Sequence, residues 1–332
     1  MGGMMRTSVS EKLEIIRIVE ESALGVAQTL AELDIPRSTF YRWYSAYQAL
    51  GEDGLVDGRP ATKQHWNRIP DAVRQQVVAI AREQPGLSPR ELACHITDTR
   101  DYFISESSVY RILKSFDLVT SPAFTVITSA KQFKHPTKRV NELWQTDFTQ
   151  FKVVGWGWYY LSTVIDDYSR YILAWTLNTT MAATDVQATL EKALTFTSVE
   201  HVAVQHRPRL LSDNGPAYLS GDLAKFLKAH EMTHIRGKPF HPQTQGKIER
   251  YHRSIKNVIC LENHYFPWQL EHAIADFVDD YNNRRYHEAL FNLTPAHVYW
   301  GRSDQVLRQR ATVKSRTLAQ RRADYLMQMS AI

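Results

Sequence analysis

The sequence predicts a multidomain protein in which two all-α modules precede an α/β domain built on a mixed sheet. Three observations support this prediction: the chain has 332 residues, helical apolar spacing occurs in two separate stretches before residue 120, and strand-like stretches follow residue 142. The length is about twice that of a usual domain, so several domains are expected. Hydrophobic residues make up 43% of the chain and charged residues 23%, which excludes general disorder.

The first helical module is expected at residues 8–50. Apolar residues at helical spacing predict two helices before the turn at 34–36, and Ser38 is expected to cap a third helix, 39–47. Two helices joined by a short turn are typical of a helix-turn-helix, whose last helix lies in the major groove of DNA. The last helix carries three candidate DNA contacts, Arg37, Tyr41 and Arg42.

A second helical module with the same layout is expected at residues 68–120. It has a helix at 71–83, a second helix capped by Ser88, and a third that starts at Ser105 or Ser107. The third helix is expected to turn four apolar side chains toward the core: Val109, Ile112, Leu113 and Phe116. It also carries two candidate DNA contacts, Arg111 and Lys114. Plain three-helix bundles with solvated basic faces are the alternative for both modules.

Three further segments differ in composition from the modules. Residues 51–67 are rich in glycine, proline and charge and are expected to form a linker. Residues 121–140 contain four basic and no acidic residues, and this basic linker either follows a phosphate backbone or is simply solvated. Residues 301–332 are expected to form a basic C-terminal tail, because 302–324 carry seven basic and two acidic residues. The net charge of +5 favours polyanionic partners only mildly.

The third domain is expected at residues 141–300, where aromatic and β-branched residues predict three antiparallel strands. A helix with Val186, Leu190 and Leu194 on its inner face follows them. A short strand at 209–212, another helix, a strand at 233–236 and a long helix from about residue 244 complete the domain. The order β-β-β-α-β-α-β-α predicts a mixed sheet flanked by helices.

Three carboxylates stand out by their positions in these predicted elements. Asp147 lies inside the first strand, where an unpaired charge would be costly. Asp213 follows a buried strand at a sharp turn, and open α/β sheets bind ligands at such strand ends. Glu249 lies on the last helix in a stripe with Arg253 and Lys256, so it shares a face with two cations that suit a phosphate.

Carboxylates that converge on one site repel each other and need compensation. Oxygen ligands without a Cys or His cluster suit Mg²⁺, or Mn²⁺ in its place. Two such ions can activate a water or a hydroxyl and stabilise the leaving oxygen of a phosphoryl displacement. Each acid taken alone is more often a surface or capping group, so this interpretation depends on all three acting together.

The segments around these acids resemble a known family. LWQTDFT surrounds Asp147, SDNGPAY surrounds Asp213, and HPQTQGKIERYHRSIK surrounds Glu249, with 35 residues between the last two acids and Lys256 seven residues after Glu249. Together with VIDDYSRYILAW and YNNRRYHEALFNLTPAHVY, they resemble the retroviral-integrase-type (DDE) core. Over residues 8–300 the chain resembles insertion-sequence transposases of the IS3 and IS481 groups.

This resemblance implies a ribonuclease-H-like core in a DDE-type transposase, which binds transposon ends, cuts beside them and joins a 3′-hydroxyl to new DNA. It makes Asp147, Asp213 and Glu249 the catalytic ligands of two Mg²⁺ or Mn²⁺ ions. Lys256 would contact DNA near the reacting phosphate, and Arg253 is a further DNA-binding candidate. The implied partners are double-stranded DNA, namely the terminal repeats and the target, and further copies of the chain in a homo-oligomer.

Other positions match the family with less definite roles. Asn214 and Gly215 would shape the turn that aims Asp213, and Asp166 is interpreted as a hairpin residue. Four residues stay open between structural and DNA-contact roles: His241, Arg284, Arg285 and His287. The sequence departs from the retroviral relatives in lacking their N-terminal His/Cys zinc module, and it shows no sustained heptad for a leucine zipper, so the assembly surfaces are not identified.

Two other functional classes fit part of the sequence. A DNA-binding repressor of its own element would use the core only for assembly, and the intact acids argue against it. A stand-alone nuclease fits the core and leaves the two helix-turn-helix modules without a purpose. A cytoplasmic location, with nucleoid association on DNA and no membrane contact, is expected because the chain lacks a signal-peptide pattern, a long apolar run and closely spaced cysteines.

Overall fold

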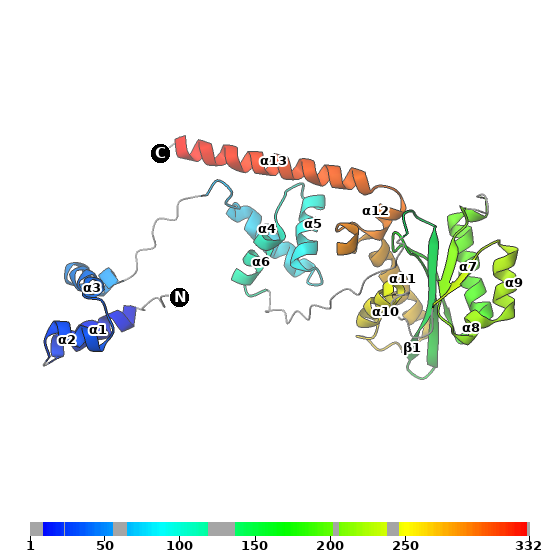
Figure 1. Ribbon diagram of the computed structural model, residues 1–332, viewed down its shortest axis with the longest axis horizontal. Helices are drawn as coiled ribbons and strands as arrows, with labels where there is room; N and C mark the ends of the chain where they lie inside the picture. The colour runs from blue at the N-terminus through cyan, green and yellow to red at the C-terminus, as the bar shows by residue number, and fades with distance from the viewer. Residues whose placement is uncertain are drawn as a thin grey trace. The chain divides into compact units, whose positions relative to one another are not determined.

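The computed structural model describes residues 9–22, 24–55, 65–118, 137–201, 206–237 and 246–330 (Figure 1). The chain divides into two compact units, Met1–Trp66 and Asn67–Ile332. The first unit holds the first helical module. The second unit holds the second helical module, the α/β core and the C-terminal helix. Most of the predicted basic linker, namely its residues 121–136, lies outside the described residues.

The first unit consists of α1 (Val9–Glu21), α2 (Val26–Glu32), α3 (Arg37–Leu50) and a 3₁₀ turn (Gly51–Leu55). Its small core contains five buried apolar side chains among the described residues: Ile16, Val19, Leu30, Phe40 and Leu55. The predicted cap at Ser38 is wrong, because Pro36 occupies the position before α3 and Ser38 lies in the first turn. Proline is tolerated at a helix start, because the N–H that it lacks would have no partner within the helix there.

The second module consists of α4 (Asp71–Glu83), α5 (Pro89–Thr99) and α6 (Glu106–Ser115). Ser88 caps α5, as predicted, in a capping box with Glu91, and Ser105 caps α6. The predicted inner face of α6 is confirmed except at Phe116, whose side chain is 45% exposed. Phe116 follows the last residue of α6 and therefore leaves the helical stripe.

The core is a five-stranded mixed sheet with strand order β3-β2-β1-β4-β5. β1 (Leu143–Val153), β2 (Gly157–Asp166) and β3 (Ile172–Asn178) are antiparallel neighbours, whereas β4 (Arg209–Ser212) and β5 (His234–Arg236) run parallel to β1. This is the ribonuclease-H-like arrangement that the sequence predicts.

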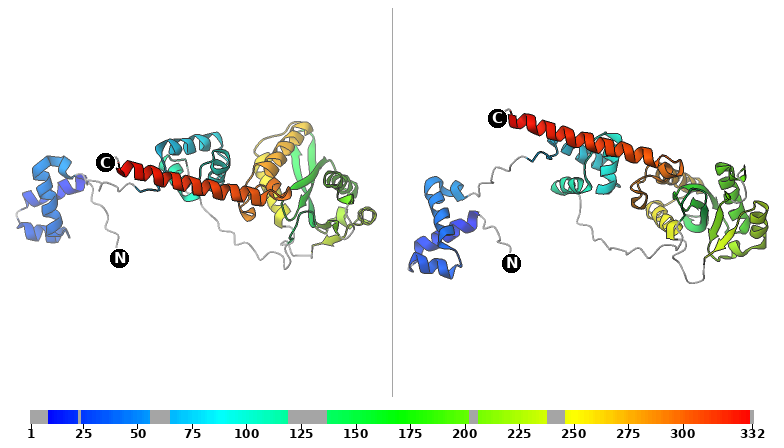
Figure 2. Two further views of the ribbon diagram at one scale, coloured as in Figure 1. Left: turned by 90° about the horizontal axis from the view of Figure 1, so that it is seen from above. Right: turned by 45° about the horizontal axis from the view of Figure 1, so that its top comes forward.

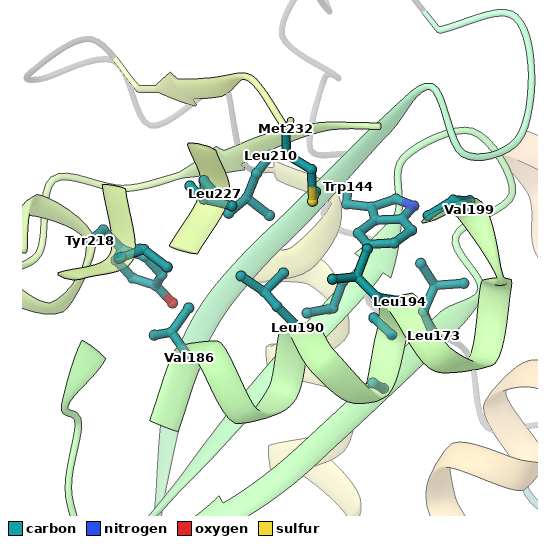
Figure 3. Close-up of a cluster of buried hydrophobic side chains, with 14 of the residues drawn as sticks. Trp144, Leu173, Val186, Leu190, Leu194, Val199, Leu210, Tyr218, Leu227 and Met232 are labelled. Atoms are coloured by element: carbon teal, nitrogen blue, oxygen red, sulfur yellow. The ribbon is translucent and has the colours of Figure 1, made fainter. Parts of the chain in front are cut away.

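Helices cover both faces of this sheet (Figure 1). One face packs against α7 (Ala183–Thr197), α8 (Pro216–Leu219) and α9 (Gly221–Ala229), and Figure 3 shows Trp144 among the buried side chains of that core. The other face packs against α10 (Gly246–Ile259) and α11 (Pro267–Asn283). The buried side of α10 consists of Ile248, Tyr251, His252, Ile255 and Ile259. The sheet therefore separates two apolar cores. Of the predicted acids, Asp147 lies on β1, Asp213 follows the end of β4, and Glu249 lies on α10.

Two further helices close the second unit, α12 (Pro295–Tyr299) and α13 (Ser303–Ser330). The segment expected to be a basic tail is thus helical, and no glycine or proline interrupts α13. One face of α13 lies along the second module (Figure 2): Arg310 pairs with Asp98, Val313 is buried, Phe103 N–H donates to Thr317 Oγ1, and Arg321 donates to Tyr102. Some of the basic side chains of this segment therefore contact the second module instead of facing solvent.

No helix among the described residues combines the length and the apolar character that a bilayer crossing requires.

Candidate catalytic and DNA-binding site

Asp147 is held in the middle of β1, opposite Thr163 of β2. Its side chain is only 22% exposed, and one carboxylate oxygen lies 3.4 Å from Nδ1 of His252 on α10. Gln145, two residues earlier and therefore on the same face of the strand, also contacts α10. Asp147 thus faces the helix that carries the third predicted acid.

Asp213 lies beside Asp147 because β1 and β4 run parallel in a defined register. Gln145 on β1 pairs with Leu211 on β4, and each aspartate follows its paired residue by two positions. Asp147 and Asp213 therefore lie at the same level along the two neighbouring segments. Partial desolvation raises the pKa of Asp213 above its usual value, and the nearby charge of Asp147 adds to the rise, while the Gly215 N–H opposes it. The structure therefore brings these two carboxylates together.

The turn after β4 is built to hold Asp213 in place. Gly215 N–H donates to Asp213 Oδ1 at 2.9 Å, and Asn214 Nδ2 donates to the Gly237 carbonyl at 2.8 Å. A Cβ at Gly215 would come within 3.1 Å of the same Asp213 oxygen, so the turn favours glycine for reasons of space. Asn214 and Gly215 thus have the positions that their predicted role in this turn requires.

Glu249 lies in the first turn of α10 and is exposed. His252, one turn further along, contacts Asp147, so α10 approaches the pair of aspartates at this point. Within the described part of the chain, no group of three or more His, Cys, Asp or Glu side chains is arranged to hold a metal ion. The structure therefore brings Asp147 and Asp213 close together, and it places Glu249 on the neighbouring helix α10. Lys256 and Arg253 are exposed on α10 as well, at the predicted spacing from Glu249.

The predicted DNA contacts of the helical modules are all exposed. Arg37, Tyr41 and Arg42 lie on α3 of the first module. Arg111 and Lys114 lie on α6 of the second, where Arg111 Nε donates to the Ser107 carbonyl. Exposure on the last helix of each module is the arrangement that DNA contact requires.

The neighbouring acids Asp166 and Asp167 are both buried, but they do different things. Asp166 closes the β2–β3 hairpin, accepting hydrogen bonds from Ser169 N–H and Oγ and from Asn141 N–H, and burial raises its pKa. This confirms its interpretation as a hairpin residue. Asp167 instead pairs with Lys247 on α10. Sequence reasoning missed Asp167, Lys247, Gln145 and His252, although Lys247 and His252 lie at i−2 and i+3 from Glu249.

Three of the four residues whose role the sequence leaves open lie in the described part of the core: Arg284, Arg285 and His287. Arg284 forms an exposed ion pair with Asp279. Burial, followed by the charges of Arg170 and Arg285, lowers the pKa of His287 to about 3, so this imidazole is neutral at physiological pH. His241 lies outside the described residues.

Comparison with known families gives matches in both halves of the chain. The Integrase core domain family matches residues 137–242, and a second family of the same description matches residues 230–295. Two families described as Homeodomain-like domain match residues 6–56 and 39–113. The matches to the integrase core include the regions of all three predicted acids, and the homeodomain-like matches fall on the two helical modules.

Individual relatives include mobile-element proteins of two kinds. The Intracisternal A-particle Pol-related polyprotein of mouse intracisternal a-particle MIA14 is 34% identical over 122 residues, which are 36% of this chain and 13% of that protein. The Gag-Pro-Pol polyprotein of mouse mammary tumor virus (strain BR6) is 32% identical over 34% of this chain and 6% of its own length. The chain thus spans only a small fraction of these polyproteins. The InsK transposase of insertion sequence element IS150 from Escherichia coli (strain K12) is 24% identical over 81% of this chain and 91% of its own length.

The similar solved structures include integrases. The HTLV-2 integrase catalytic core domain in complex with magnesium is 21% identical, with 48% of this chain and 97% of that chain covered and a TM-score of 0.38. A simian T-cell lymphotropic virus intasome in complex with PP2A regulatory subunit B56 gamma is 17% identical, with 67% and 74% covered and a TM-score of 0.43. From the family matches and the strand order, the chain carries an integrase core domain, and homeodomain-like helical modules precede it.

Proposed function

We propose that the protein is a DNA transposase that binds the ends of an insertion sequence and catalyses metal-dependent DNA nicking and strand transfer through Asp147, Asp213 and Glu249. The observation that carries this proposal is the parallel register of β1 and β4, which sets Asp147 and Asp213 side by side. Two carboxylates in this arrangement repel each other unless a cation joins them.

The donor set fits a hard divalent cation. All three predicted ligands are carboxylates, which suits Mg²⁺ or Mn²⁺ better than softer metals. A pair of such ions bound there would activate the attacking hydroxyl and stabilise the leaving oxygen of an in-line displacement. Asp147 and Asp213 would supply ligands from the sheet, and Glu249 would supply its ligand from the first turn of α10.

The protein's other contribution is to hold DNA at this site. Arg253 and Lys256 are exposed on the helix of Glu249, where they would contact phosphates of the DNA end or the target. Arg37, Tyr41 and Arg42 on α3, and Arg111 and Lys114 on α6, would hold the terminal repeat through the helical modules. A reaction that joins DNA ends to a target is expected to need a homo-oligomer bound to double-stranded DNA. The proposed location is the cytoplasm, at the nucleoid when the protein is bound to DNA.

The test of catalysis uses labelled DNA that carries the ends flanking the gene, with the full chain and Mg²⁺. The wild-type protein should nick and join this DNA, whereas Asp213→Asn should lose activity by about 1,000-fold or more while binding DNA normally, because an amide cannot replace the anionic ligand. Equal activity of both proteins would overturn the catalytic assignment. If both bind DNA and neither cuts it, the protein is a DNA-binding repressor.

The test of DNA binding uses Arg42→Ala and Glu249→Gln at several salt concentrations. Arg42→Ala should weaken binding to end DNA by about tenfold, because one phosphate or base contact is lost. Glu249→Gln, the matched control, should bind with at least wild-type affinity. Wild-type affinity should fall as the salt concentration rises, and an affinity independent of salt would contradict DNA binding through these cations.

A further inference from the structure

An ion pair between a partly buried lysine and a buried aspartate joins the start of α10 to the β2–β3 hairpin. Lys247 Nζ donates to Asp167 Oδ2 and to the Asp167 carbonyl, both at 2.7 Å. The Asp167 side chain is only 3% exposed and that of Lys247 only 19%. Removing either partner would leave the other charge buried without its counter-ion, so the contact strongly constrains where Lys247 lies.

Gln145 connects this ion pair to the backbone of α10. Its Nε2 donates to Asp167 Oδ1 at 2.6 Å, and its Oε1 accepts from Ile248 N–H at 3.2 Å. The first four N–H groups of a helix have no partner within the helix, and Ile248 N–H is one of them in α10. Gln145, which is fully buried on β1, therefore caps α10 from the sheet.

These contacts bracket Glu249. Lys247 and Ile248 immediately precede it, and His252, one turn later, contacts Asp147 at 3.4 Å. The apolar stripe of α10 already holds the helix on the sheet, but burial of apolar surface has no direction and tolerates small rotations or shifts. Hydrogen bonds of fixed geometry at the first turn remove that freedom.

We propose that Asp167, Lys247 and Gln145 form a positioning cluster that fixes the first turn of α10 and so sets Glu249 against Asp147 and Asp213. This inference rests on the proposed function, because it gives Glu249 a metal to bind. None of the three residues touches the reacting atoms. They act through the backbone of α10, and Lys247 belongs to the cluster rather than to the DNA-binding surface.

The experiment uses the full chain with Lys247→Met, which keeps the length of the side chain and removes its charge. Lys247→Arg is the conservative variant, and Lys225→Met, which breaks the exposed pair between Lys225 and Asp222 on α9, is the matched control. Asp167→Asn tests the same cluster from the other side, in case Lys247→Met does not fold.

Four measurements are compared across these variants. Hydrogen exchange of the first turn of α10 should become about tenfold faster in Lys247→Met and Asp167→Asn, with β1 and β4 unchanged. Mn²⁺ binding to the protein without DNA, followed by electron paramagnetic resonance, should weaken about tenfold. Strand cleavage should fall about 10- to 100-fold and recover in part at high Mg²⁺, since misplaced ligands cost rate and metal affinity together. End-DNA affinity should stay within about twofold, and Lys247→Arg should restore much of each loss.

The outcomes separate this inference from the proposed function. Wild-type exchange in the first turn of α10, or wild-type Mn²⁺ affinity in a folded Lys247→Met protein, would overturn the positioning role. So would losses equal to those of Lys225→Met. If instead the wild-type protein does not cut DNA at all, the proposed function fails, while exchange and Mn²⁺ binding still decide whether the cluster positions Glu249.

Discussion

The two helical modules have the same sequence pattern and different places in the molecule. The first forms a unit of its own, with five buried apolar side chains in the described residues, whereas the second has ten and belongs to the same unit as the α/β core. The difference lies in α13, whose side chains reach the second module from more than 200 residues away in the sequence. A local pattern therefore identifies a helix-turn-helix without indicating whether it is fixed to the core.

The contact that distinguishes the second module most clearly is centred on Asp98. Arg310 donates to both Asp98 carboxylate oxygens, at 2.7 and 2.6 Å, and also to the Asn292 carbonyl. The Tyr286 hydroxyl donates to the same carboxylate, and burial followed by the Asp98 charge raises the pKa of that hydroxyl. Asp98 thus links α5 to α13 and to the segment after α11.

The largest expected effect comes from Arg310→Leu. This change leaves Asp98 largely buried without its main partner, which should lower the free energy of opening of α5 by about 3 kcal/mol. Hydrogen exchange in increasing urea measures this segment by segment. The helices of the first unit should be unaffected, and the exposed Arg308→Leu on the same helix is the control. An equal loss in α3 and α5 would contradict the independence of the two modules.

A smaller effect should separate the helix caps of the two modules. Ser88→Ala removes the capping box of α5 and should cost about 1 kcal/mol of module stability, measured by the same exchange method. Ser38→Ala in α3 should change stability by less than about 0.5 kcal/mol, because Ser38 is not the cap. A cost at Ser38 as large as that at Ser88 would restore the sequence-based prediction that Ser38 caps α3.

The smallest effect is expected at the ion pair between Arg316 and Asp101. Both side chains are 59% exposed, so Arg316→Gln should cost no more than about 0.5 kcal/mol. That cost should vanish at about 1 M salt, where exposed charges are screened, whereas the effect of Arg310→Leu should largely persist. If the two substitutions respond to salt in the same way, the partly buried Arg310–Asp98 pair does not hold the second module more tightly than an exposed pair.

Local signals predicted most of the core. Most strands and helices from β1 to α10 follow from alternating or helical apolar spacing, and the parallel register of β1 and β4 brings Asp213, which follows β4, near Asp147. The catalytic and metal-binding roles of Asp147, Asp213 and Glu249 stay predictions. The spacing of apolar residues predicts Phe116 on the inner face of α6, but the helix ends one residue earlier, at Ser115. Apolar spacing alone does not determine a helix end to within one residue.

The contacts that could not be predicted join residues far apart in sequence. Asp167 and Lys247 are 80 residues apart, and Gln145 and Ile248 are 103 apart, so no local pattern relates them. The charge of the C-terminal segment predicts a solvated tail, whereas the absence of glycine and proline from 303 to 330 favours the helix that the structure has. Which of its arginines would pair with the second module depended on the folded surface of α5.

Because α13 is one uninterrupted helix, its contacts are linked by helical phase. Arg310, Val313, Thr317 and Arg321 lie on one side of it, at intervals of three and four residues. One residue inserted between Ser303 and Arg310 would turn this whole side by about 100° and advance it by about 1.5 Å. All four contacts would then be lost together. The number of residues between α12 and Arg310 therefore determines whether the contact side of α13 faces the second module.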